Sequence, residues 1–140
     1  MNIVKLNKKI NFTEYYNLIN QLSPINFKLF EKNIKDFIDK LDKNINIFLL
    51  INNNKIIGSG TVIIENKIIH NFKKVGHIED VIIDKNSRGN GYGEKLVKYL
   101  IDFSEKLNCY KIILNCSEKN MKFYEKIGFK KKNLEMSLYK

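Results

Sequence analysis

The fold is decided by residues 88–93, which read Arg88-Gly89-Asn90-Gly91-Tyr92-Gly93. Three glycines within five residues let the backbone turn sharply, so that successive N–H groups can converge. An apolar run precedes this segment and an amphipathic run follows it. A helix that begins here adds the positive end of its dipole to the turn. The pattern therefore predicts a strand, a tight turn and a helix, with an anion cradle at the turn; a connection that binds nothing has the same pattern.

The spacing of the glycines indicates which class of phosphate ligand the cradle would bind. A diphosphate presents several oxygens at the spacing of successive amides, and Arg88 can add a charge-assisted hydrogen bond. The dinucleotide fingerprint needs the spacing G-x-G-x-x-G, and the nucleoside-triphosphate loop needs a glycine-lysine pair followed by serine or threonine. The turn instead has the spacing R-x-x-G-x-G, so neither of these two motifs is present.

Toward the amino terminus, the pattern predicts four strands and two helices. A strand is expected over residues 77–84, and a hairpin over 45–51 and 56–64 is closed by three consecutive asparagines. Apolar residues recur at helical spacing over 12–22 and 27–41, and both helices are expected to cover the core. A weak alternation over residues 2–6 indicates an opening strand, and residues 67–72 are expected to be irregular.

Toward the carboxyl terminus, a helix is predicted over residues 92–107 and a buried strand over 110–116. A short helix follows over 118–127, ended by Gly128, and residues 129–139 are expected to form terminal strand. Strands alternate with helices only in this second half of the chain. The fold class is therefore α/β with a mixed sheet, in a single domain over residues 1–140.

Composition bounds the possible partners. The chain has 140 residues, of which 44% are hydrophobic and 29% charged, as in ordinary globular proteins. No stretch has the eighteen or so apolar residues of a membrane helix, so a cytoplasmic protein without a membrane partner is expected. The formal net charge of +10 invites a nucleic-acid role, but the lysines are scattered and arginine occurs once. We therefore expect no nucleic-acid partner.

The two cysteines, Cys109 and Cys116, are expected to be buried reduced thiols. They flank a predicted strand and would lie about 23 Å apart along it, too far for a disulfide. No histidine accompanies them as a metal ligand. No metal site is expected.

Two motifs resemble those of a known superfamily. The spacing R-x-x-G-x-G between strand and helix resembles the acetyl-CoA pyrophosphate loop of the GNAT superfamily of N-acetyltransferases. Residues 120–129 resemble its closing motif, in which an Asn near the cofactor precedes a helix whose Tyr faces the acetyl sulfur. Further runs are similar to the glucosamine-6-phosphate N-acetyltransferase family, namely residues 67–70, 76–80, 109–114 and 118–120. The likeness covers roughly residues 60–136.

The resemblance implies a fold, a reaction and a set of cofactor contacts. The fold would be that of GNAT acyl-CoA N-acyltransferases, a central twisted mixed sheet flanked by helices. The reaction would move the acetyl group of acetyl-CoA to the 2-amino group of glucosamine 6-phosphate, in UDP-N-acetylglucosamine biosynthesis, by direct attack in a ternary complex of a homodimer. The residues assigned to acetyl-CoA are Val81, Ile82, Ile83, Arg88, Gly89, Asn90, Gly91, Tyr92, Gly93, Glu94, Asn115, Asn120 and Tyr124.

The resemblance also implies catalytic and substrate-binding residues. Tyr124 would protonate the departing sulfur, and the backbone carbonyl of Asn115, where most relatives carry Asp, would orient the amine together with Glu79. The substrate-binding residues would be Ser23, Lys67, His70, Glu79, Asp80, Val81, Tyr110 and Lys111. Carboxylates suit hydroxyls and an amine, and cations suit a phosphate. Because adjacent residues of a strand face opposite sides, at most one of Glu79 and Asp80 is expected to reach a given pocket directly.

Three other interpretations stay open at this point. A GNAT enzyme could act on another amine, such as a protein amino terminus, a polyamine or an antibiotic. A basic nucleic-acid-binding module would account for the net charge alone. A catalytically silent acyl-CoA binder would keep the cradle without the reaction.

Overall fold

A five-stranded sheet in the order β1-β2-β3-β4-β5 runs through the computed structural model, which describes residues 1–140. The strands are β1 (Asn2–Lys5), β2 (Ile45–Asn52), β3 (Lys55–Asn66), β4 (Lys74–Ile83) and β5 (Cys109–Leu114). The first three pairings are antiparallel and the pairing of β4 with β5 is parallel. The predicted mixed sheet is therefore confirmed.

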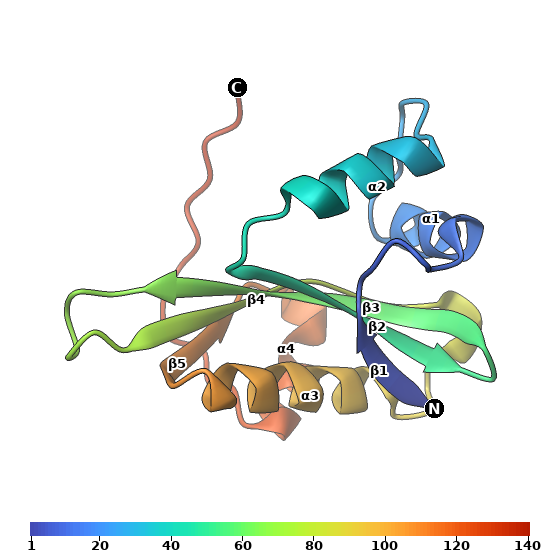
Figure 1. The fold of residues 1–140 in the computed structure, drawn as a ribbon. Helices are drawn as coiled ribbons and strands as arrows, with labels where there is room; N and C mark the ends of the chain where they lie inside the picture. Colours follow the sequence, from blue (N-terminus) through green and yellow to red (C-terminus); the bar gives the residue numbers. More distant parts are fainter.

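Four helices cover the two faces of this sheet. They are α1 (Phe12–Leu22), α2 (Glu31–Lys40), α3 (Tyr92–Lys106) and α4 (Glu118–Ile127). Figure 1 shows α1 and α2 over one face, and α3 with α4 beside it on the other. None of the four helices combines the length and the apolar character that a membrane crossing requires.

Local signals in the sequence account for the helix and hairpin ends. The Asn11 side chain accepts a hydrogen bond from the N–H of Glu14 (3.2 Å), which caps α1. Gly128 ends α4 in a left-handed conformation with φ 110°. The β2–β3 turn places Asn53 and Asn54 at positive φ, which asparagine tolerates better than most residues. These predicted boundaries are confirmed.

The core lies on both faces of the sheet. The larger cluster joins β2, β3 and β4 to α3, whose Leu96, Val97 and Leu100 have no exposed surface. The smaller cluster includes Leu6, Tyr15, Ile47 and Leu49 and lies under α1 and α2. Burying one such aliphatic side chain contributes about 1.5–3 kcal/mol, so α3 is the helix that the sheet holds most firmly.

A bulge interrupts β4 in its second half. Thr61 of β3 pairs with Glu79, and Ser59 pairs with Ile82, so that Asp80 and Val81 together oppose Gly60. Asp80 has φ 51°, in the left-handed region. A bulge re-aims the side chains that follow it, and the expectation that at most one of Glu79 and Asp80 reaches a given pocket stays a prediction.

Beyond the bulge, β4 has no strand on its β5 side. The parallel pairing ends at Ile78 with Leu114, whereas β4 continues to Ile83 with β3 alone beside it. The backbone groups of residues 79–83 on that side are therefore open to an extended ligand, as at any sheet edge.

Two predictions about the amino-terminal half and β5 are wrong. Helix α2 begins only at Glu31, so Phe27 and Phe30 precede it, and α2 contains no buried residue. It covers the smaller cluster through partly buried residues such as Ile34 and Ile38. Strand β5 lies at the sheet edge, and Ile113 is 38% exposed rather than buried. A period of apolar residues does not reveal which strand is outermost.

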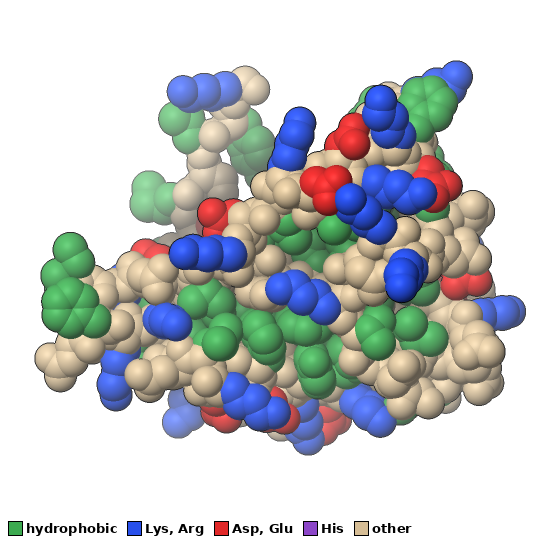
Figure 2. All heavy atoms as spheres, in the orientation of Figure 1, with side chains coloured by type: hydrophobic (Ala, Val, Ile, Leu, Met, Phe, Trp, Pro, Cys, Tyr) green, Lys and Arg blue, Asp and Glu red, His purple; other side chains and the backbone are tan.

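The carboxyl-terminal tail and the cysteines also differ from expectation. Residues 129–140 form no strand, because no strand of the same chain pairs with them. The tail leaves Leu134, Met136 and Leu138 almost fully exposed, and hydrophobic side chains also gather at the tip of the β3–β4 hairpin (Figure 2). Both cysteines are free, as expected, but Cys116 is exposed and Cys109 is only half-buried.

Candidate active site

The turn between β4 and α3 presents a row of unpaired donors. A short 3-10 turn (Lys85–Ser87) leads into it, and Gly89 and Gly91 have φ of 81° and 76°. The N–H groups of residues 89–94 donate to no acceptor within the chain. They lie at the positive end of the α3 dipole, which is the arrangement that an anion cradle requires.

Side chains around the cradle hold its shape. Asn90 donates from Nδ2 to the carbonyls of Ser87 and Arg88, both at 3.1 Å. Asn52 of the β2–β3 hairpin donates to the Tyr92 hydroxyl at 3.2 Å. These contacts fix the turn before any ligand arrives, which lowers the entropy that binding would cost.

Arg88 has side-chain donors available for an anion, whereas the Glu94 side chain is already paired. The Arg88 Nε donates to the carbonyl of Ile83 at 3.0 Å, which anchors the guanidinium at the end of β4 and leaves its terminal nitrogens for an anion. Glu94 instead pairs with Lys98 at 2.6 Å, and the hydrogen bond from Lys98 lowers the pKa of Glu94. The N–H of Glu94 is therefore the part that suits the cradle.

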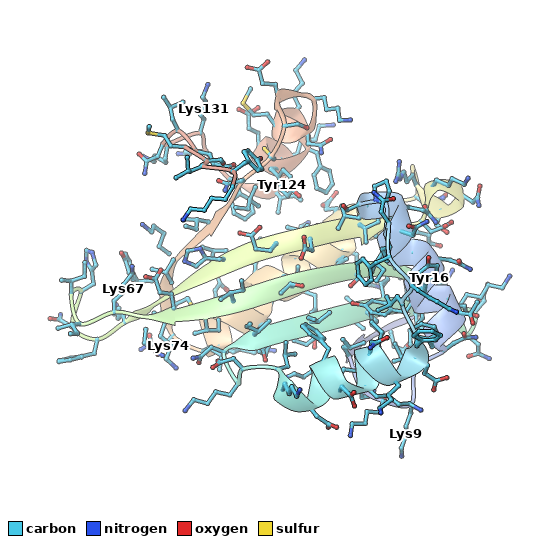
Figure 3. The ribbon with its side chains drawn as sticks, turned by 90° about the horizontal axis from the view of Figure 1, so that it is seen from above. Lys9, Tyr16, Lys67, Lys74, Tyr124 and Lys131 are labelled. Carbon is cyan, nitrogen blue, oxygen red and sulfur yellow. The ribbon has the colours of Figure 1, made fainter.

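Tyr124 lies where β4 and β5 separate. It packs on the larger core cluster together with Val81, Ile83 and Phe123. Its ring meets Phe123 edge-on at 4.9 Å and Phe129 at 5.9 Å. Figure 3 shows β5 leaving β4 toward α4, with Tyr124 on the α4 side of that opening. Aromatic contacts on two sides fix the direction of the ring.

The Tyr124 hydroxyl is a proton donor without a partner in the chain. Burial raises its pKa, and the nearby Cys116 raises it further. The hydroxyl therefore stays protonated at neutral pH. The hydroxyl makes no hydrogen bond to a protein group. Every buried polar side-chain atom in the structure has a hydrogen-bond partner, so this oxygen is not among the buried atoms. The hydroxyl is thus solvated and free to donate to a ligand.

Two asparagines of the predicted cofactor set are placed at the ends of elements. Asn115 follows the last residue of β5 and is exposed, so that its backbone carbonyl lies at the point of divergence from β4. Asn120 lies in the first turn of α4 and its N–H donates to the Ser117 carbonyl at 2.9 Å. The structure therefore groups Asn115 with the opening that Tyr124 lines.

Glu79 and Asp80 sit at the bulge, on the rim of the same opening. Burial raises the pKa of Glu79, the Asp80 charge adds to the rise, His77 opposes it, and Glu135 of the tail adds to it slightly. A carboxylate with a raised pKa beside an open strand edge is typical of groups that exchange protons with a ligand.

Sequence reasoning missed Tyr15, which lies under the bulge. Tyr15 is a buried residue of α1, and burial raises its pKa. A hydrogen bond with Ser59 lowers that pKa and the Asp80 charge raises it. Its helical spacing indicated only a core residue, and its nearness to Asp80 follows from the packing of α1 on β3 and β4.

A second group of predicted substrate residues lies at the opposite end of β4. The His70 and Tyr110 rings are 4.4 Å apart, and the Lys111 Nζ lies 5.8 Å from the Tyr110 ring. Lys67 forms an ion pair with Glu65. Figure 3 shows Lys67 at the far tip of the β3–β4 hairpin, away from Tyr124.

The Tyr110 part of the second group is separated from Glu79 within one chain. Cys109, next to Tyr110, pairs with Lys74, which lies five residues before Glu79, or about 16 Å along the strand. Ser23 follows α1 and is exposed. Its helix is tied to the cradle end of β4 by the Gln21–Asp84 hydrogen bond of 2.8 Å. One copy of the chain therefore does not bring all predicted substrate residues together.

The comparisons with known proteins agree on one family. The model of the acetyltransferase (GNAT) family matches residues 12–129. A glucosamine 6-phosphate N-acetyltransferase from Arabidopsis thaliana is 47% identical over 85 residues, which are 61% of this chain and 57% of that protein. A second protein of that name, glucosamine 6-phosphate N-acetyltransferase 1 from Dictyostelium discoideum, is 46% identical over 86 residues, 61% of this chain and 55% of its own length. The match thus spans little more than half of these curated relatives.

A solved structure extends the likeness to the whole chain. The crystal structure of glucosamine-6-phosphate N-acetyltransferase from Arabidopsis thaliana superposes with a TM-score of 0.91 at 33% identity. The superposition covers 99% of this chain and 97% of the other. The expected fold and the recognised superfamily are therefore confirmed.

Proposed function

We propose, because the chain belongs to the GNAT acetyltransferase family, that it transfers the acetyl group of acetyl-CoA to the 2-amino group of glucosamine 6-phosphate. GNAT acetyltransferases use acetyl-CoA. The observation that carries the proposal is the row of unpaired N–H groups over residues 89–94, next to the open edge of β4. The relatives named above support glucosamine 6-phosphate as the amine.

The cradle and the strand edge fit two parts of acetyl-CoA. A diphosphate matches six successive amides at a helix start, with Arg88 as an additional donor. The pantetheine arm carries amide groups, which suit the side of β4 at Val81 and Ile82 that faces no β5 strand. The thioester would then lie toward Tyr124 and Asn115, where β4 and β5 diverge.

The reaction requires little from the protein beyond placement and proton handling. The substrate nitrogen forms a bond to the acetyl carbon while the carbon–sulfur bond breaks. Glu79, and the carbonyl of Asn115, accept hydrogen bonds from the amine, and Glu79 takes up its proton. Tyr124 donates its own proton to the leaving sulfur, which its raised pKa permits because the hydroxyl is protonated at neutral pH. Holding both reactants in place supplies much of the rate enhancement.

We also propose that the active form is a homodimer. In one chain Lys111 pairs with Val75, four residues or about 13 Å along β4 from Glu79, and Lys67 is already paired with Glu65. The tail alternates apolar and polar residues over 134–138, as a strand would, yet it has no strand partner. A second copy would supply both a partner for the tail and phosphate-binding cations for the site. A single species of monomer mass in sedimentation at micromolar concentration would contradict this.

The activity is tested by release of free thiol from acetyl-CoA. Glucosamine 6-phosphate should give turnover well above that of glucosamine, because only the phosphate engages the cations. A panel with a polyamine, an aminoglycoside and a peptide amino terminus serves as control. Faster release with any of these would replace the proposed acceptor, and no release with any amine would leave only acyl-CoA binding.

A further inference from the structure

His77 has a defined partner that the proposed reaction does not use. Its Nε2 lies 2.8 Å from the Glu65 Oε2, and Glu65 also binds Lys67 through its other oxygen. His77 lies in residues 76–80, which are similar to the glucosamine-6-phosphate N-acetyltransferase family, but the sequence assigned it no functional role. A histidine that is hydrogen-bonded to a carboxylate has a ring of fixed orientation.

The strand geometry places His77 beside Glu79. The two residues are separated by one position on β4 and share one face of the sheet, about 7 Å apart along the strand. His77 pairs with Ile63 of β3 and with Ile113 of β5, so neither neighbouring strand inserts a charge directly opposite it. Glu65 reaches the ring from the next position on the same face of β3.

The other charges around Glu79 are negative. Burial favours the neutral carboxyl of Glu79, and so do the charges of Asp80, its neighbour in the bulge, and of Glu135 in the tail. Tyr15 from α1 faces Asp80 and is neutral. His77 is the one group that opposes them. When the ring carries a proton, its charge acts on Glu79 against the two carboxylates.

We propose that His77 is a positioning residue for the acetyl transfer, with Glu65 fixing its ring so that the imidazolium faces Glu79 and keeps that carboxylate ionised. The inference rests on the proposed function, in which Glu79 accepts the amine proton. An acceptor that is already protonated cannot do so, and two carboxylates with no cation share a proton. Lys67 and His77 both contact Glu65, through different carboxylate oxygens. Glu65 therefore links the tip of the β3–β4 hairpin to the part of β4 that carries Glu79.

The test compares two substitutions of the same residue. His77→Gln keeps a donor toward Glu65 but removes the charge, and His77→Arg keeps a permanent charge. The acid limb of the profile of kcat/KM against pH should move to higher pH by about half a unit or more in His77→Gln. It should stay at the wild-type position in His77→Arg. Lys106→Gln, an exposed residue without an ion pair, is the matched control.

A second readout does not need turnover. The carboxyl carbon resonance of Glu79, assigned by its loss in Glu79→Gln, should titrate at higher pH in His77→Gln than in the wild type. Glu65→Gln should give a shift in the same direction, and serves if His77→Gln does not fold. Equal midpoints in wild type and His77→Gln, or equal shifts in both His77 variants, would overturn the inference. Absence of turnover in the wild type would overturn the proposed function instead, while the titration still decides the role of His77.

Discussion

Replacing Tyr124 by Phe removes one oxygen and leaves the packing of the ring intact. The edge-on contacts with Phe123 at 4.9 Å and Phe129 at 5.9 Å involve only ring carbons. The hydroxyl makes no hydrogen bond within the chain, so its loss breaks none. We expect the free energy of unfolding to change by less than about 0.5 kcal/mol.

The effect on turnover should be large by comparison. Proton transfer by a positioned side chain contributes about 10²–10⁴-fold to a rate, and the Tyr124 hydroxyl is the donor that we assign to the leaving sulfur. We therefore expect kcat to fall at least about 100-fold, equivalent to about 2.7 kcal/mol of transition-state stabilisation, with the KM for acetyl-CoA nearly unchanged.

The assay is thiol release at saturating acetyl-CoA and glucosamine 6-phosphate, with thermal unfolding of both proteins measured in parallel. Tyr16→Phe is the matched control, because Tyr16 lies on α1 and is remote from the opening between β4 and β5 (Figure 3). A kcat within threefold of the wild type in a stably folded Tyr124→Phe would refute the assigned proton donor.

Three further outcomes are expected. Gly91→Ala should lower the free energy of unfolding by about 1 kcal/mol, because a φ of 76° strains any residue with a side chain, even though no atom lies within 4 Å of the new Cβ. The same change should weaken acetyl-CoA binding in calorimetry, and unchanged binding would argue against the cradle. Glu79→Gln should raise the melting temperature at neutral pH and abolish most turnover. The folded-state pKa of Glu79 is raised, so the wild-type protein loses stability as pH rises through that pKa. The difference in melting temperature between Glu79→Gln and the wild type should therefore vanish near about pH 4. Met136→Asp should shift sedimentation toward the monomer, because Met136 is 95% exposed in one chain; an unaltered dimer would place the interface elsewhere.

Local features of the fold could be predicted because each depends on neighbours in the chain. Asn11 and Gly128 mark helix ends through caps that involve residues within one turn. The glycines of residues 89–93 predicted the cradle for the same reason, since positive φ at Gly89 and Gly91 is a property of the backbone itself.

The predictions that were wrong concern partners distant in the sequence. Whether β5 is central or at an edge depends on which strands flank it, and the tail over residues 129–140 has a strand-like pattern with no partner to pair with. Apolar periodicity reports only that one face is to be buried, and not what buries it.

Most of the helices and strands, the turn at residues 88–93 and the family could be predicted from the sequence, because glycine spacing, capping residues and apolar periodicity act through local backbone geometry. The bulge at Asp80, the distance of Lys111 from Glu79 and the pairing of His77 with Glu65 became visible only in the folded chain. These depend on the register between strands, which is set by the packing of the whole sheet against its helices, and no short stretch of sequence contains that information.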